Sequence, residues 1–229
     1  MAAVVPWSTL EAIIEPHYPK VGPQGGRRPL PIAVMLRIYC LQQWYNLSDP
    51  GAEEALYDIQ SMRAFCNLDL GRDAIPDETT ILNFRHLLEA HALTKAVFEA
   101  VAVHLEARGA LLRGGKIVDA TLIAASPSTK NAVGQRDPQM RSSKNEGAGV
   151  LWAVKEKAKP GHRLTGRQRA RNRRFGKVRA KVEHVFCVMK CQFGYRKVRY
   201  RGLAKNGAQV FALLALANLY LARRMIASA

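Results

Sequence analysis

Acidic residues are scarce in the second half of the sequence. Residues 141–229 contain 22 Lys and Arg but only three acids, a net charge of +19, whereas residues 1–140 contain 13 Lys and Arg and 15 Asp and Glu. So concentrated a positive charge opposes compaction of the chain unless a polyanion neutralises it. Nucleic acid is the polyanion that we expect as a partner. A merely solvated basic surface is the alternative.

Long apolar runs and cysteines are also few. The longest apolar run, Val210 to Ala222, is too short to span a bilayer and contains Asn218, so we interpret it as a buried helix. The first residues lack the charged region and the apolar block of a signal peptide. The four cysteines are too sparse for a disulfide framework and fit a reducing compartment. We therefore expect a cytoplasmic protein without a membrane segment.

The first part of the chain has the periodicity of helices. Helices are predicted over Pro6 to Ile14 and Ile32 to Tyr45, and after Asp49, Asp77 and about residue 92. Asp49 is the predicted N-cap of the third helix, with proline at the first helical position. The predicted buried stripe of that helix is Ala52, Ala55, Leu56, Ile59 and Met62. Because this pattern continues to about Gly109, we expect a helical N-terminal domain over residues 1–112.

The pattern changes from helical to extended after Gly114-Gly115, where "KIVDATLIAA" follows. It predicts a strand over residues 116–124 that contains one carboxylate, Asp119. This acid is either a polar position facing water or an acid held at a sheet edge to bind metal. Further on, the sequence predicts a long basic helix from about Arg167 to Phe193 and an apolar helix from about Gly207 to Met225.

The long basic helix has three stripes at helical spacing. Its apolar arc, the predicted core face, is Val178, Val182, Val185, Phe186, Met189 and Phe193. One flank, predicted to face solvent or DNA, is Arg173, Arg174, Lys177 and Lys181. The opposite flank is Arg179, Glu183, Cys187 and Lys190. From spacing alone Glu183 is the ion-pair partner of Arg179, and His184, Cys187 and Cys191 could suggest zinc, although a fourth ligand is not evident.

Several longer segments carry a resemblance to a known family. The segments are "WYNLSDPGAEEALYDIQSMRAFCNL", "IPDETTILNFRHLLE", "VDATLIAASPSTKN" followed by "RDPQM", and "RAKVEHVFCVMKCQFGYRKVRYRGLAKN". In these segments the chain resembles bacterial insertion-sequence transposases of the DDE type, which have an RNase H-like catalytic fold. The family pattern of Arg, three residues, Glu, six residues, Lys is met by Arg179, Glu183 and Lys190. The tyrosine often found three positions before that Arg is Gly176 here.

The resemblance implies a fold, a site and partners. The fold is mostly α with a small α/β part, in which the helical N-terminal domain precedes a truncated RNase H-like domain over residues 113–229. Asp119 and Glu183 would be catalytic acids that bind Mg²⁺, with Arg179 and Lys190 beside them. The implied partner is double-stranded DNA carrying the terminal inverted repeats of a transposon, in the bacterial nucleoid, and a homo-oligomer is left open. The expected DNA contacts are Arg85, Arg173, Arg174, Lys177, Lys181, Arg199 and Arg201.

One family element has no counterpart. A second catalytic Asp is expected between Asp119 and Glu183, where the chain offers only Asp137, Glu146 and Glu156. None of these fits, which indicates an internal deletion within about residues 145–150. Three interpretations remain: a transposase by descent that has lost activity, a DNA-binding regulator or inhibitor derived from the element, and an unrelated basic protein.

Overall fold

The computed structural model describes residues 1, 3–20, 29–110 and 163–227, most of which are helical. The elements are α1 (Trp7–Ile14), the 3-10 turn η1 (Glu15–His17), α2 (Ile32–Tyr45), α3 (Asp49–Asp58), α4 (Gln60–Cys66), α5 (Glu78–Ala90), α6 (Leu93–Ala107), α7 (Gly166–Cys187), the π-turn η2 (Val188–Gln192) and α8 (Leu203–Ala227). The prediction of a mostly α-helical protein is thus confirmed. The strand predicted over 116–124, with Asp119, lies outside the described residues.

Helices α3 and α5 begin at side-chain caps, which satisfy N–H groups of the first turn. A helix was predicted to start at Asp77, and Asp77 caps α5: its carboxylate accepts a hydrogen bond from the Thr80 N–H at 2.7 Å. The predicted cap of α3 is wrong by one position. The cap is Ser48, whose hydroxyl accepts from the Gly51 N–H at 3.0 Å. Asp49 therefore lies in the first turn, where its carboxylate is available for an ion pair.

The single helix predicted after Asp49 is two helices, α3 and α4, because the chain leaves the helical conformation at Ile59. Neither Gly nor Pro marks this break in the sequence. Arg63 donates hydrogen bonds to the carbonyls of Leu56 at 2.9 Å and Tyr57 at 2.5 Å, at the end of α3. Ile59 was predicted to be buried, but it is 40% exposed.

The core is built around α2, which contacts α1, α3, α4, α5 and α8. Nine of its residues are buried, as expected for a helix enclosed by other helices. Two of the nine are polar. Gln42 donates to the Asp49 carboxylate at 2.9 Å, and Gln43 accepts from the Gln209 amide at 3.4 Å. These bonds tie α2 to α3 and to α8.

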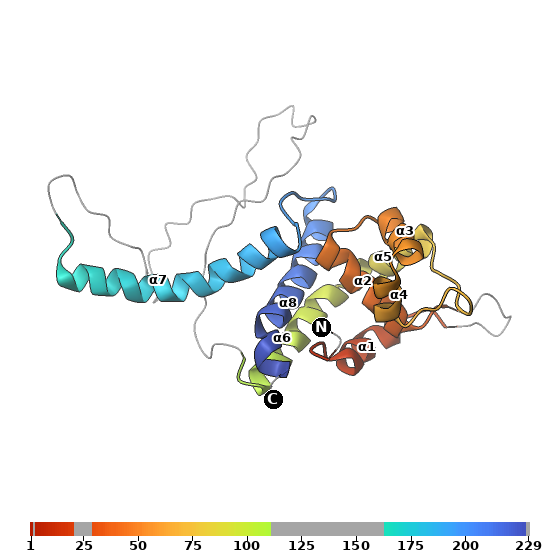
Figure 1. Cartoon of the computed structure of the whole chain (residues 1–229), viewed down its shortest axis with the longest axis horizontal. Helices are drawn as coiled ribbons and strands as arrows, with labels where there is room; N and C mark the ends of the chain where they lie inside the picture. Colours follow the sequence, from red (N-terminus) through yellow and green to blue (C-terminus); the bar gives the residue numbers. More distant parts are fainter. Residues whose placement is uncertain (2, 21–28, 111–162, 228–229) are drawn as a thin grey trace, which may run out of the picture.

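Helix α8 packs into this same core, although it lies near the other end of the sequence. It runs beside α6 (Figure 1), and its residues Ala212, Ala215, Leu219, Ala222 and Ile226 belong to the cluster formed by the N-terminal helices. By length and composition α8 could cross a membrane, and 44% of its most apolar window is buried. The packing of α8 on α6 accounts for its apolar character as that of a core helix.

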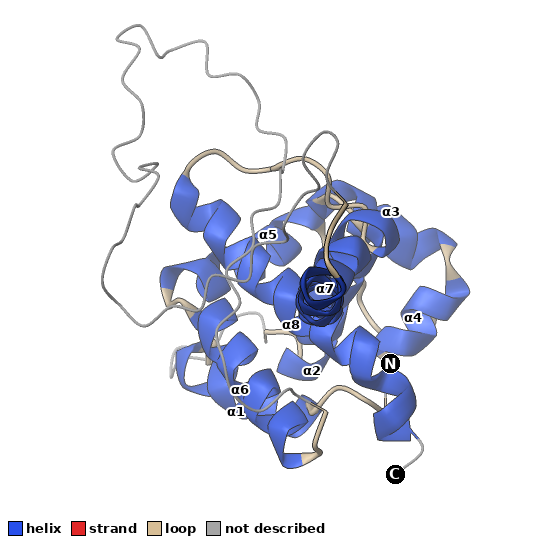
Figure 2. Ribbon diagram, turned by 90° about the vertical axis from the view of Figure 1, so that its left-hand side faces the viewer, coloured by secondary structure: helices blue, strands red, loops and turns tan. Residues whose placement is uncertain are grey.

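Helix α7 projects from the helical body and is joined to it at its C-terminal end (Figure 1). Figure 2 shows the helix end-on, in front of the body. At its end α7 contacts α8 and continues into the π-turn η2, where Val188 and Met189 are buried. Residues 193–202, called the connecting segment below, lead from η2 to α8. The predicted long helix is therefore confirmed, but its last turn is wider than an α-helix.

Candidate nucleic-acid interface

Helix α7 begins at a capping box that fixes its exposed end. The Thr165 hydroxyl accepts from the Gln168 N–H at 3.3 Å, and the Gln168 side chain accepts from the Thr165 N–H at 2.8 Å. This reciprocal pair satisfies two N–H groups that the first helical turn leaves without helical partners. The start of α7 is thus defined locally, without support from the helical body.

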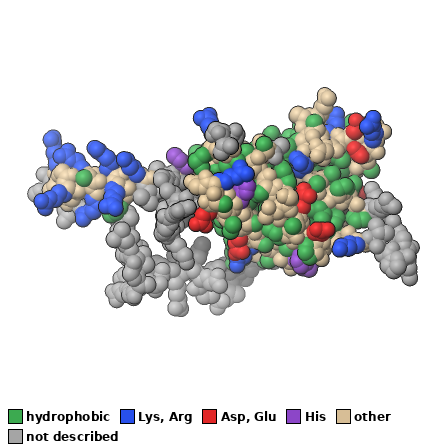
Figure 3. Space-filling view, turned by 90° about the horizontal axis from the view of Figure 1, so that it is seen from below, with side chains coloured by type: hydrophobic (Ala, Val, Ile, Leu, Met, Phe, Trp, Pro, Cys, Tyr) green, Lys and Arg blue, Asp and Glu red, His purple; other side chains and the backbone are tan. Residues whose placement is uncertain are grey.

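The exposed part of α7 is strongly basic. Residues 163–177 contain seven Lys and Arg and no Asp or Glu. All seven side chains are exposed: Arg163, Arg167, Arg169, Arg171, Arg173, Arg174 and Lys177. Figure 3 shows Lys and Arg side chains along the projecting rod. At about 100° per residue, those within the helix cover more than half of its circumference. The helix therefore presents positive charge on several sides.

The sequence predicted only part of this surface. From the flank expected to face DNA, Arg173, Arg174 and Lys177 are exposed, while the side chain of Lys181 lies outside the described part. Arg163, Arg167, Arg169 and Arg171 were not predicted as contacts. For the last three of these residues the sequence did contain a signal of exposure. In "RQRARNRR" Arg alternates with uncharged residues, and the segment contains no acid.

The catalytic residues implied by the resemblance are only partly described. Glu183 is exposed on α7, and Lys190 is half-buried in η2. Asp119 and the side chain of Arg179 lie outside the described residues. Because η2 is a π-turn, Lys190 is rotated relative to Glu183 compared with a regular α-helix. Among the described residues, no group of three or more His, Cys, Asp or Glu could hold a metal ion.

Arg85 lies inside the helical body, where it is 6% exposed. Its guanidinium binds the carboxylates of Asp49 at 3.0 Å and Glu89 at 2.9 Å, and it lies over the Tyr200 ring at 4.4 Å. Burial lowers the pKa of Arg85. The interactions that raise the pKa, among them the hydrogen bonds to both carboxylates, together outweigh burial, so the net shift is upward. Arg85 thus joins α3, α5 and the connecting segment, and we leave it out of the DNA contacts proposed below.

Arg199 and Arg201 lie in the connecting segment and differ in their surroundings. Arg199 donates hydrogen bonds to the Leu47 carbonyl, the Asn46 carbonyl and the Asn46 side-chain oxygen, each at 2.5 Å. Arg201 is exposed. The two arginines, both predicted as DNA contacts, therefore occupy different environments.

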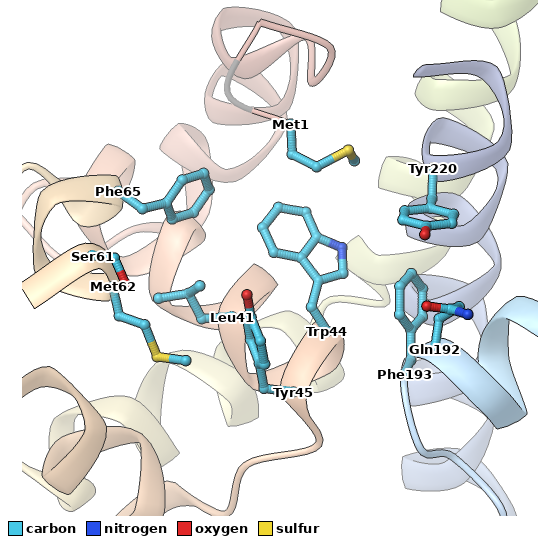
Figure 4. A pocket seen from close by; sticks show the side chains of 10 residues that line it. All are labelled: Met1, Leu41, Trp44, Tyr45, Ser61, Met62, Phe65, Gln192, Phe193 and Tyr220. Carbon is cyan, nitrogen blue, oxygen red and sulfur yellow. The ribbon is translucent and has the colours of Figure 1, made fainter. Parts of the chain in front are cut away.

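A groove of about 390 Å³ lies between α2, α4, η2 and α8 (Figure 4). Two aromatic pairs line it: Trp44 with Phe65, whose centroids are 5.4 Å apart, and Phe193 with Tyr220 at 6.0 Å. The Trp44 indole N–H is buried without a hydrogen-bond partner within the described structure. The groove is mainly apolar and aromatic. One wall comes from α2 and α4 and the other from η2, Phe193 and α8.

Comparison with known proteins gives two family matches. Residues 1–87 match the Transposase domain (DUF772), and residues 130–219 match the Transposase DDE domain. No solved structure gives a significant match to the chain. Together the two matched ranges cover more than half of the sequence, and the chain belongs to the insertion-sequence transposases of the DDE type.

The matched ranges can be placed on the structure. The first contains α1 to α4 and most of α5, and the second contains α7, η2 and most of α8. Glu183, Arg179 and Lys190 lie within the second range, whereas Asp119 lies between the two. In the described structure, the two matched ranges meet in one core through α2 and α8.

Proposed function

We propose that this transposase-type chain binds double-stranded DNA at the ends of its element, and that α7 supplies the main contact surface. The observation that carries the proposal is the projecting helix with seven exposed basic residues and no acid over residues 163–177. Such a surface attracts phosphate, because each phosphate neutralised releases condensed counterions. Arg201 is included as a contact because it is exposed in the connecting segment between η2 and α8.

The dimensions of α7 support this mode of binding. A helix of 22 residues is about 33 Å long. The major groove of B-DNA is about 12 Å wide and admits an α-helix. Because charge is spread around the helix, basic side chains can reach the phosphates on both sides of a groove while others face the bases. We therefore propose phosphate contacts as the main source of affinity.

We also propose that the chain does not cleave or join DNA. Transposases of the DDE type typically use divalent metal ions, held by three acids in the family pattern. Glu183 is the one expected ligand within the described residues, and Asp119 lies outside them. What supports the proposal is the sequence: the second Asp has no counterpart in it, as expected if a segment of an RNase H-like domain is deleted near residues 145–150. We therefore derive no metal-dependent step.

A regulator or inhibitor is the second candidate function, and one observation favours it over a decaying remnant. Helix α8 packs against α6 and α2 in a shared core, so the basic helix is attached to a well-packed body. A chain of this kind could occupy the ends of the element and block an intact transposase. In a mixture with an intact relative, this candidate predicts that added chain lowers strand transfer and that excess end DNA restores it.

The experiment that tests the proposal combines binding and cleavage on one labelled duplex. Purified protein is titrated against terminal-repeat DNA and against a scrambled duplex of equal length, with Mg²⁺ or Mn²⁺ present, and nicks are scored on denaturing gels. We expect tighter binding to the end duplex and no nicks. Equal binding to both duplexes would contradict end recognition. Nicks that disappear in Asp119→Ala would contradict the loss of catalysis.

A further inference from the structure

Arg199 binds the turn that joins α2 to α3. The chain leaves α2 through Asn46, which has φ 54°, and Arg199 donates to the carbonyls of Asn46 and Leu47, which lie beyond the last helical residue. The planar guanidinium presents several donors, so it reaches both carbonyls and the Asn46 side chain at once. Arg199 thus holds the connecting segment against this turn, although it lies 153 residues after Asn46.

Other bonds hold the connecting segment at the same place. The Asn46 side chain donates to the Gly194 carbonyl at 3.4 Å, so this residue contacts the segment at two points. Phe193 and Tyr195 are buried against α8 and η2. Asn206 donates to the carbonyls of Tyr200 and Gly202, both at 2.7 Å, and braces the turn before α8.

The contact between Arg199 and Asn46 lies close in sequence to the base of α7. The connecting segment follows directly after η2, which continues α7, so the segment fixes the base of the projecting helix. Asn46 belongs to the first family match and Arg199 to the second. The bond between them therefore joins the base of the basic helix to the N-terminal body.

We propose that Arg199 is a positioning residue: it holds α7 in its DNA-binding direction by binding the turn between α2 and α3, and it does not itself neutralise a phosphate. This inference rests on the proposed binding of DNA by α7. It separates Arg199 from Arg201, which carries the same charge two residues away and is proposed to contact phosphate. The two arginines should then fail in different ways when each is replaced.

The first arm of the test measures DNA affinity against salt for the wild type, Arg199→Ala and Arg201→Ala. The slope of log affinity against log salt changes by about 0.9 for each phosphate that the protein no longer neutralises. We expect Arg201→Ala to reduce the slope by about this amount and Arg199→Ala to leave it unchanged. Affinity should still fall in Arg199→Ala: if α7 keeps its binding direction about one-fifth of the time, the apparent Kd rises about fivefold.

The second arm measures the direction of α7 without DNA. Spin labels are placed at Ala170→Cys on α7 and Glu54→Cys on α3, both exposed, in a background where the exposed Cys187 and Cys191 are replaced by Ser. We expect a distance distribution that broadens in Arg199→Ala and narrows again in Arg199→Lys, which keeps a donor for the carbonyls. Arg201→Ala, the matched control, should leave the distribution unchanged.

The outcomes separate the two proposals. A slope reduced in Arg199→Ala, or a distance distribution that does not broaden, overturns the positioning role. If the wild type shows no salt-dependent binding, the proposed function fails, while the spin-label arm still decides whether Arg199 positions α7. Circular dichroism of each variant distinguishes a reoriented helix from an unfolded one.

Discussion

Replacement of Arg85 by Ala should destabilise the protein strongly. The Arg85 side chain is 8% exposed and binds Asp49 and Glu89, whose side chains are 19% and 14% exposed. Removal of the guanidinium leaves both carboxylates partly buried without that partner, and it also removes the interaction with the Tyr200 ring. Loss of one member of a buried ion pair costs about 3–5 kcal/mol. That is a large share of the roughly 5–15 kcal/mol by which a typical domain is stable.

A matched control lies on the next helix. Lys95 and Glu99 form an ion pair with the same i,i+4 spacing as Arg85 and Glu89, but their atoms are 3.9 Å apart and their side chains are 60% and 64% exposed. Lys95→Ala should cost about 0.3–0.5 kcal/mol, as exposed helical pairs do. Urea unfolding followed by tryptophan fluorescence measures both variants. If Arg85→Ala does not fold, Arg85→Lys is measured in its place, because an ammonium lacks the planar fork of donors that reaches two carboxylates. The reasoning is refuted if the Arg85 variants lose no more stability than Lys95→Ala.

Three further predictions test the described elements. Asp77→Ala should cost about 1 kcal/mol by removing the cap of α5, measured by urea unfolding, and a loss near zero would contradict the cap. Burial raises the pKa of both Cys40 and Cys66 to about 12, so at pH 8 these thiols should stay unmodified by a thiol reagent while the two exposed cysteines of α7 and η2 react; equal rates for all four would contradict it. Gly194 has φ +68°, so Gly194→Ala should lower the stability of the protein by about 1 kcal/mol. Gly166→Ala, at the start of α7 with nothing within 4 Å of an added Cβ, should be neutral or stabilising. Thermal melts that show equal losses of stability in the two variants would contradict this.

The helices could be predicted because their signals are local. The helical spacing of apolar residues from Ile32 to Tyr45 predicted α2 with its observed bounds, and Asp77 marked the start of α5. The break at Ile59 could not be predicted, since no Gly or Pro marks it. It depends on Arg63, which binds the carbonyls at the end of α3 only after the chain has turned.

The candidate site was harder to predict, because the role of an arginine depends on distant partners. The resemblance placed Arg85 and Arg199 among the expected DNA contacts, without information on their partners in the fold. The acceptors of Arg85 include Asp49, 36 residues away, and those of Arg199 lie more than 150 residues away. No local pattern reveals such pairs. The basic surface of α7 was predictable in kind, because seven like charges without an acid can hardly be buried.

Helix α7 is proposed as the DNA-binding surface, and the salt dependence of binding tests this proposal most directly. The triple variant of Arg167, Arg169 and Arg173 to Ala removes three exposed charges and favours the helix, since Ala is the best helix former. The triple variant of Lys20, Arg72 and Arg108 to Ala removes three exposed charges from the helical body. The account predicts that the α7 variant lowers the slope of log affinity against log salt by about 2 to 3, while the body variant leaves it unchanged. Equal slopes in the two variants would contradict it.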